Sequence, residues 1–323
     1  MKDFIIPVAI FLLLMLLIPM ISLINAKKVN NHVNTYASAS QTISIKSDNF
    51  TFKIKDGKTG NYETVKGFDF ICGVVAGEMP ASYNVEALKA QAVAALTYCL
   101  YQNENGTIVT GLSIAYLTPE EQKKRWSSNY ENNKKKIEHA VSEVYGKVLT
   151  YDGKIIDAVF FNMSSGITEN CKDVFGKELP YLVEVSSPGD TLQEDFISHT
   201  ALTLDEFKAK VKGFDKDADF SGNPADYLKI EKRSGAGGVI SARLCGKEVS
   251  GRDIRSIFGL RSANFTLSYK DGTFDFEVKG NGHGVGMSQR GAQYMAQQGK
   301  NWREILKWYY KGAEISDYSE NLL

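Results

Sequence analysis

The chain has 323 residues, of which 43% are hydrophobic and 24% are charged, as in a globular protein long enough to bury a sizeable core. Lys plus Arg and Asp plus Glu both number 38, so no basic surplus indicates a nucleic-acid partner, and we expect none. The cysteines, at positions 72, 99, 171 and 245, include no close pair of the kind that binds zinc, so we expect no metal site and no cofactor.

Residues 4–26 form a nearly continuous apolar run without a charge, long enough to span a bilayer. A cleaved signal peptide is the alternative, but the run exceeds a usual signal core, and Ile24 is a poor residue for the position three before a cut after Ala26. We therefore expect a membrane anchor over residues 1–26 and a flexible tether over residues 27–44. The folded region over residues 45–323 is large enough for one or two lobes.

Apolar spacing and start and stop signals predict several helices in this folded region. Thr203 with Glu206 and Asn301 with Glu304 match the capping-box pattern of helix starts. The expected helices cover residues 85–101, 119–126 and 131–145, a short segment after residue 203, residues 288–298 and a segment after residue 301.

Alternating apolar residues bounded by turn signals predict strands between these helices. The dipeptides at 152–153 and 271–272 are both Asp-Gly, which favours hairpin turns. The expected strands cover residues 43–56, 147–151, 155–161, 228–231, 239–244, 265–269 and 274–278. Because strands and helices do not alternate regularly, we expect an α+β fold of mixed helices and antiparallel strands around a substrate cleft, preceded by one N-terminal transmembrane helix.

Glu78 is the strongest candidate for a catalytic residue. It precedes Met79 and Pro80, and a proline steers the residue before it away from helical geometry, so we expect a turn here and a helix only after Asn84, its cap. That helix should have one apolar face, running from Val85 to Cys99. A carboxyl group in apolar surroundings favours its protonated form, as a general acid near neutral pH requires. The alternative is a structural glutamate that binds backbone amides.

Two polar loops contain further candidates. Ser164, Ser165 and Thr168 follow an expected strand and offer hydroxyl groups that suit a sugar, although such residues also make ordinary turns. His283 lies among alternating glycines at 280, 282, 284 and 286, which let a backbone approach a ligand closely. The spacing of these glycines is not that of a dinucleotide-binding loop. The segment around Ser288 resembles the nucleophile turn of a hydrolase, but Arg290 stands where that turn needs its second glycine, so we expect Ser288 to cap a helix.

Taken together, four segments resemble the stage II sporulation protein D family, whose relatives include amidase enhancers. They are residues 77–98, Phe160–Tyr181, Val249–Phe265 and His283–Tyr310. The resemblance implies a single-pass protein of the cell membrane whose extracytoplasmic region cleaves the glycan strands of peptidoglycan as a lytic transglycosylase. It also implies Glu78 as the acid and makes Thr168 and Tyr181 ligand candidates, beside Ser164, Ser165 and His283.

The reaction implied by this resemblance needs one carboxyl group. Glu78 would protonate the departing oxygen and then accept a proton from the C6 hydroxyl of N-acetylmuramic acid, which closes a 1,6-anhydro ring. The implied setting is forespore engulfment during sporulation, with a sporulation amidase that removes stem peptides and companion membrane proteins of the engulfment machinery as partners. The alternative is a non-catalytic peptidoglycan-binding protein or amidase enhancer of the same fold.

The chain departs from that family pattern at three places. Leu96 and Val183 stand where many relatives carry Arg and Lys, which puts the strength of catalysis in doubt. Some relatives bind zinc through His and Cys in the segment after the first helix, but residues 106–117 contain neither, so no zinc site is expected.

Overall fold

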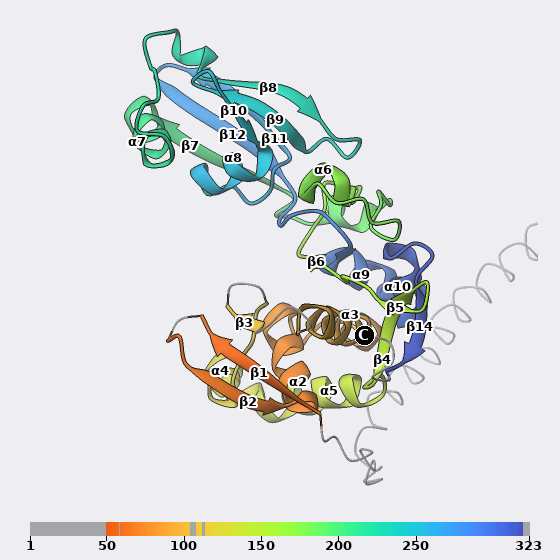
Figure 1. Ribbon diagram of the computed structural model, residues 1–323. Coiled ribbons are helices and arrows are strands. Elements are labelled where there is room, and N and C mark those ends of the chain that lie inside the picture. Colours follow the sequence, from red (N-terminus) through yellow and green to blue (C-terminus); the bar gives the residue numbers. More distant parts are fainter. Residues whose placement is uncertain (1–49, 58, 104–107, 112–113, 319–323) are drawn as a thin grey trace, which may run out of the picture. The chain divides into compact units, whose positions relative to one another are not determined.

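The computed structural model describes residues 50–57, 59–103, 108–111 and 114–318 (Figure 1). The expected membrane anchor, the tether and the first part of the expected strand over residues 43–56 lie outside the described residues. None of the helices within the described ranges is long and apolar enough to cross a bilayer.

The described part of the chain has an α+β fold, as predicted, with its strands in small sheets (Figure 1). Most neighbouring strands are antiparallel, but β1 with β3 and β6 with β13 are parallel. The sheets are β2 (Tyr62–Lys66), β1 (Thr51–Asp56) and β3 (Ile108–Thr110); β14 (Glu314–Asp317), β4 (Lys147–Tyr151) and β5 (Lys154–Ile155); β13 (Met287–Ser288) and β6 (Phe160–Phe161); β10 (Lys247–Ser250), β9 (Val239–Leu244) and β8 (Leu228–Arg233); β11 (Phe265–Lys270), β12 (Thr273–Lys279) and β7 (Ile197–Thr203).

Helices lie between and beside these sheets, and their starts follow local capping chemistry. Thr203 and Asn301 form the expected capping boxes, and the side chain of Ser288 accepts the amide of Gly291 as the cap of α9. The α-helices are α2 (Gly67–Glu78), α3 (Val85–Asn103), α4 (Pro119–Trp126), α5 (Tyr130–Ser142), α6 (Cys171–Phe175), α7 (Leu204–Phe214), α8 (Gly251–Phe258), α9 (Gln289–Gln297) and α10 (Trp302–Tyr309). Three 3₁₀ turns are described, η2 (Ser127–Asn129), η3 (Pro188–Leu192) and η4 (Pro224–Asp226).

Helix α2 corrects the expectation for the segment before Pro80. The sequence predicted a turn at Glu78, but Glu78 is the last residue of a helix, and Met79 follows in an extended conformation (φ −122°, ψ 146°). Proline therefore ends a helix here. The helix escaped prediction because its apolar residues are nearly continuous, so they show no helical period.

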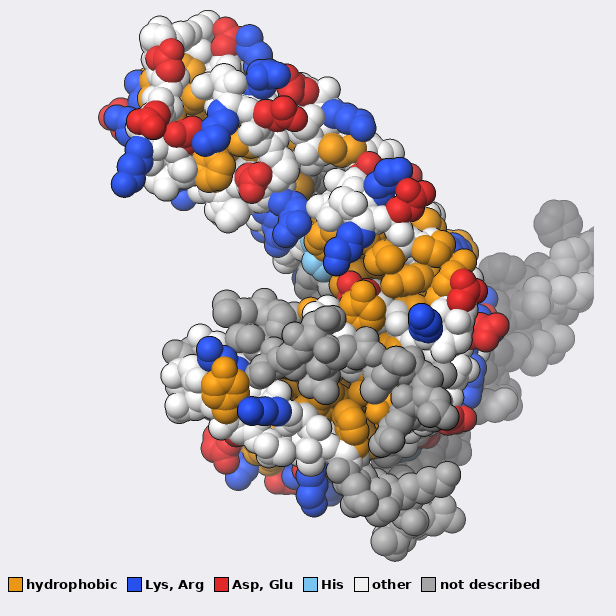
Figure 2. Space-filling model, viewed as in Figure 1, with side chains coloured by type: hydrophobic (Ala, Val, Ile, Leu, Met, Phe, Trp, Pro, Cys, Tyr) orange, Lys and Arg blue, Asp and Glu red, His pale blue; other side chains and the backbone are white. Residues whose placement is uncertain are grey.

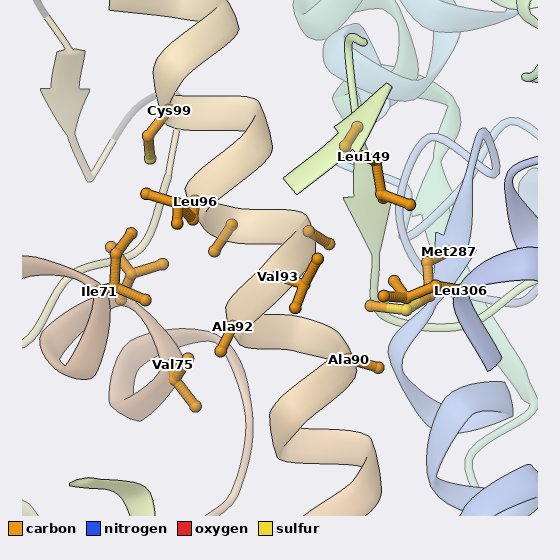
Figure 3. Close-up of a cluster of buried hydrophobic side chains, with 14 of the residues drawn as sticks. Ile71, Val75, Ala90, Ala92, Val93, Leu96, Cys99, Leu149, Met287 and Leu306 are labelled. Carbon is orange, nitrogen blue, oxygen red and sulfur yellow. The ribbon is translucent and has the colours of Figure 1, made fainter. Parts of the chain in front are cut away.

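The first hydrophobic core surrounds α3, which is buried on more than the one face that was predicted. Figure 3 shows Leu96 and Ala92 directed towards α2, while Val93 on the other side of the helix faces Leu149 and Leu306. Ala-rich sequence allows α2, α5, α9, α10 and β4 to pack closely around this helix. A helix that is buried nearly all round shows little amphipathic periodicity, which is why the prediction identified one face only.

A second hydrophobic core is built from β7 to β12 with α7 and α8. Phe207 stacks between Phe258 and Phe274, with ring centroids 4.8 and 4.0 Å away. The chain enters and leaves this core at adjacent positions, because Ile197 pairs with Lys279 across the β7–β12 ladder. On the face drawn in Figure 2, acidic and basic side chains are interspersed over the described residues, as expected from their equal numbers in the sequence.

Candidate functional site

Glu78 lies at the C-terminal end of α2, half-buried beside the segment that leads into α4. This segment can run close to the helix because Gly73 and Gly77 have no side chain: a Cβ atom at Gly73 would lie 2.4 Å from the ring of Tyr116. The amide of Leu117 donates to the carbonyl of Gly73 (3.1 Å), which fixes the segment in place. This segment therefore lies close to the end of α2 that carries Glu78.

Two N–H donors bind the carboxyl group of Glu78. The backbone amide of Ala115 donates to Oε1 (2.7 Å), and the side-chain amide of Gln289, the first residue of α9, donates to Oε2 (2.9 Å). The same Gln289 nitrogen also reaches Oε1 of Gln91 on α3 at 3.4 Å. Both glutamines are buried, so α2, α3 and α9 together orient one carboxyl group.

Burial raises the pKa of Glu78, and the hydrogen bonds from Ala115 and Gln289 oppose that rise. The position at the end of α2 acts in the same direction as burial, because the C-terminal end of a helix carries partial negative charge. Within the described residues Glu78 forms no ion pair, so no cation counteracts these effects. The result is a carboxyl group that can hold a proton at a higher pH than an exposed glutamate.

Tyr98 on α3 is a further candidate, close enough to Glu78 for the two groups to interact electrostatically. Burial, together with the neighbouring ionisable groups of Asp157, Cys99 and Glu78, raises the pKa of Tyr98 to about 12, so the phenol keeps its proton. Its ring lies 6.0 Å from that of Phe160 on β6. A protonated phenol close to a carboxyl group is a suitable donor to a polar ligand.

Ser164, one of the predicted ligand residues, is buried and holds a structural carboxylate. Its hydroxyl and its amide both donate to Oδ2 of Asp190, at 2.5 and 2.8 Å. The hydroxyl of Ser288, the cap of α9, donates to the other oxygen of Asp190 at 2.8 Å. Asp190 therefore joins the loop after β6 to the start of the helix that contains Gln289.

Thr168 and Tyr181 are also engaged by the protein itself. Thr168 is fully buried: its hydroxyl donates to the carbonyl of Val183 (3.2 Å) and accepts the amide of Val185 (2.9 Å). The phenol oxygen of Tyr181 accepts the amide of Asp157 at 3.2 Å. In this state of the protein both side chains brace the backbone.

His283 has both ring nitrogens occupied. Nε2 donates to the carbonyl of Phe160 (3.0 Å), and Nδ1 accepts the amide of Val285 (3.2 Å), so the ring is neutral. Burial lowers the pKa of His283 to about 4, with smaller contributions from Arg255 and Arg252. The hydroxyl of Ser165 donates to the carbonyl of Ala236, in the turn between β8 and β9, at 3.0 Å.

The structure therefore divides the predicted site residues into separate groups. Ser164, Ser165 and His283 line one pocket, whereas Glu78, Thr168 and Tyr181 do not line it. Among the described residues no group of three or more His, Cys, Asp or Glu side chains is placed to hold a metal ion.

Sequence reasoning missed the donors around Glu78. Gln289 is 211 positions away in the chain, so no spacing could connect the two residues. Ala115 acts through its backbone, which the identity of its side chain does not reveal. The sequence contained one signal of these contacts. Gly73 and Gly77 lack side chains, which lets the segment with Ala115 and Tyr116 approach α2 closely.

Comparisons with known proteins identify the family. A sequence model described as "Stage II sporulation protein" matches residues 55–151, which include α2 and α3. The chain is 39% identical over 272 residues to stage II sporulation protein D of Bacillus amyloliquefaciens, covering 80% of this chain and 77% of that protein. This chain belongs to the stage II sporulation protein D family. The corresponding protein of Bacillus subtilis (strain 168) is 33% identical over 337 residues, which cover 98% of this chain and 96% of that protein.

The family thus includes this chain over nearly its whole length, as its resemblance in sequence predicted. A Bacillus subtilis (strain 168) protein named amidase enhancer is also related, at 28% identity over 294 residues, or 76% of this chain and 40% of that protein. Most of this chain is therefore similar both to stage II sporulation protein D relatives and to an amidase enhancer.

Proposed function

We propose that this protein is a lytic transglycosylase that cleaves the bond between N-acetylmuramic acid and N-acetylglucosamine in the glycan strands of peptidoglycan. The observation that carries the proposal is the environment of Glu78. It is a half-buried carboxyl group with a raised pKa, bound by two N–H donors and without an ion-pair partner among the described residues. This combination suits a group that gives up a proton and then takes one back.

In the proposed reaction Glu78 acts twice. It donates its proton to the oxygen that leaves C1 of N-acetylmuramic acid, and the C1–O bond breaks. The resulting carboxylate accepts the proton of the C6 hydroxyl as O6 bonds to C1, which closes the 1,6-anhydro ring and restores the acid. The N–H groups of Ala115 and Gln289 stabilise the carboxylate between these steps.

Family membership supports the biological setting of this proposal. We place the reaction in sporulation, during engulfment of the forespore, with the folded region outside the cell membrane and residues 1–26 as its anchor. Peptidoglycan glycan strands are the substrate, and a sporulation amidase and companion membrane proteins of the engulfment machinery are the proposed partners.

The alternative is a non-catalytic role in binding peptidoglycan or enhancing an amidase. Its support is the relative named amidase enhancer and the apolar residue Leu96, which lies buried in the first core at a position where the family resemblance leads us to expect a cation. Such a protein would bind glycan strands without cleaving them.

The decisive experiment compares the full-length chain with Glu78→Gln on denuded glycan strands. We expect 1,6-anhydro-N-acetylmuramic acid ends from the wild type and a loss of at least a hundredfold with Glu78→Gln, measured by mass spectrometry. Glu131→Gln, at an exposed position on α5, is the matched control and should retain activity. Normal product from Glu78→Gln would overturn the catalytic assignment, and strand binding without product from the wild type would favour the alternative.

A further inference from the structure

A pocket that Glu78 does not line lies between the loop after β6 and the second core. One wall consists of Ser165, Glu169 and the Gly282–Gly284 turn with His283. The other wall contains the start of α8 and the segment 262–264. The two walls come from parts of the chain with separate hydrophobic cores, so the pocket forms only in the folded assembly of both.

Glu169 is unusual in this pocket because it is buried, at 7% exposure, and because one of its two carboxylate oxygens has no hydrogen-bond partner among the described residues. The carboxylate has a side-chain hydrogen bond with Ser234, and its Oε1 accepts the amide of Gly238 at 3.2 Å, while its buried Oε2 has no hydrogen-bond partner among the described residues. The backbone crowds this carboxylate: a Cβ atom at Gly284 would lie 2.6 Å from its Cγ. A buried acceptor without a partner costs free energy unless a ligand or water supplies a donor.

The opposite wall carries cations without counter-ions. Arg252 and Arg255 line the pocket from α8, and neither forms an ion pair with a described residue. The guanidinium of Arg252 lies over the ring of Phe175 at 5.2 Å, and that ring lies 5.4 Å from His283. Burial lowers the pKa of Arg255, and the positive charge of Arg252 adds to the effect. An anion between the two arginines would relieve this repulsion.

The carboxylate and the guanidinium groups do not neutralise each other. Burial raises the pKa of Glu169, and its charged neighbours of note are Glu184 and Asp173, not the arginines. Apolar side chains, among them Ile167 and Val174, line the space between the two walls. A complementary ligand therefore carries an N–H or O–H donor at one end, an anionic group at the other and methyl groups between them.

We propose that this pocket is a subsite for N-acetylmuramic acid, in which Glu169 accepts a hydrogen bond from the acetamido N–H group and Arg252 with Arg255 binds the lactyl carboxylate. The acetyl and lactyl methyl groups then contact the apolar lining. The choice of this sugar among small carboxylic acids rests on the proposed function. The subsite would distinguish the two sugars of the strand, because N-acetylglucosamine has the donor but lacks the carboxylate.

Binding of single sugars to the full-length chain tests this proposal without any cleavage. We expect calorimetry to show at least tenfold tighter binding of N-acetylmuramic acid than of N-acetylglucosamine or of the lactyl methyl ester of N-acetylmuramic acid. The difference should shrink as ionic strength rises, because salt screens the attraction between the carboxylate and the arginines.

Variants assign the binding to this pocket. Arg252→Gln and Glu169→Gln should each weaken binding of N-acetylmuramic acid about tenfold while the thermal melt shows a folded protein. Arg303→Gln is the matched control, since Arg303 also lies over an aromatic ring, Trp302, at 4.1 Å but outside the pocket. It should leave the affinity unchanged.

Equal affinity for the acid and its methyl ester, no detectable binding of either sugar, or wild-type affinity in a folded Arg252→Gln protein would each overturn the proposal. Tighter binding of the dipeptide D-alanyl-D-alanine than of N-acetylmuramic acid would replace the sugar by a peptide carboxylate. Because none of these measurements depends on Glu78, failure here and failure of the proposed cleavage remain distinguishable.

Discussion

Gln289 is the residue through which the protein can adjust the acidity of Glu78. Its side-chain amide stabilises the carboxylate, so removing that donor should raise the pKa of Glu78 further. We predict that Gln289→Met, which keeps a side chain of similar size, shifts the high-pH limb of the cleavage rate to higher pH, because Glu78 must be protonated to act as an acid.

A pH profile of the cleavage rate for the wild type and Gln289→Met measures this shift. Gln293→Met on the same helix is a suitable control, because Gln293 accepts the amide of Asn84 and does not contact Glu78. A limb that stays in place, or moves to lower pH, would show that Gln289 does not stabilise the charged form.

His283 makes a prediction about stability at acid pH. Its pKa is about 4 in the folded protein and about 6.5 when unfolded, so between these values only the unfolded chain binds the proton. Stability contributed by this residue is therefore complete above pH 6.5 and decreases as the pH falls towards 4. The loss reaches about 3 kcal/mol at most, since each pKa unit corresponds to about 1.4 kcal/mol.

Denaturant unfolding of the wild type and His283→Gln at several pH values tests this effect. Glutamine does not titrate and can still donate to the carbonyl of Phe160. We expect the difference in unfolding free energy to shrink by up to about 3 kcal/mol between pH 7 and pH 4. A difference that is constant over this range would mean that His283 titrates normally in the folded protein.

At the scale of the element, the packing of α3 determines whether position 96 can accept the cation that the family resemblance leads us to expect there. Leu96 is buried against α2 in the first core, where an unpaired guanidinium would be desolvated (Figure 3). We predict that Leu96→Arg lowers the unfolding free energy by about 3–5 kcal/mol, whereas Leu96→Met costs less than about 1.5 kcal/mol because it conserves volume. Urea unfolding of both variants tests this prediction. Equal unfolding free energies of Leu96→Arg and Leu96→Met would contradict it and would indicate that position 96 lies beside an anion or water.

The same comparison of elements shows what could be predicted from sequence. Helices with local signals were predicted closely, such as α4, whose bounds agree with the expected residues 119–126, because Thr118 and Pro119 mark its start within a few residues. Helix α2 was missed because its nearly continuous apolar sequence shows no helical period. Glu78 was identified as a candidate from its apolar neighbours, but its donors depend on contacts between distant segments, which no local pattern encodes.

At the scale of the whole molecule, Asp190 links two segments that are far apart in the sequence, one before the second core and one after it. Fully buried, it accepts hydrogen bonds from Ser164 in the loop after β6 and from Ser288 at the start of α9. The next residue, Gln289, binds Glu78. The loop that leads to the proposed sugar pocket and the donor to the proposed catalytic acid therefore share one anchor.

The adjacent positions at which the chain enters and leaves the second core have a consequence for how relatives can diverge. Phe196 and Gly280, which flank β7 and β12, are joined by a backbone hydrogen bond of 2.9 Å. A stretch of chain that begins and ends at one point can be exchanged or reshaped as a cassette without rerouting the rest of the polypeptide. Arg252 and Arg255 belong to this cassette, whereas Glu78 and its donors lie outside it. Evolution could thus change the proposed sugar subsite while leaving the proposed catalytic acid and its donors unchanged.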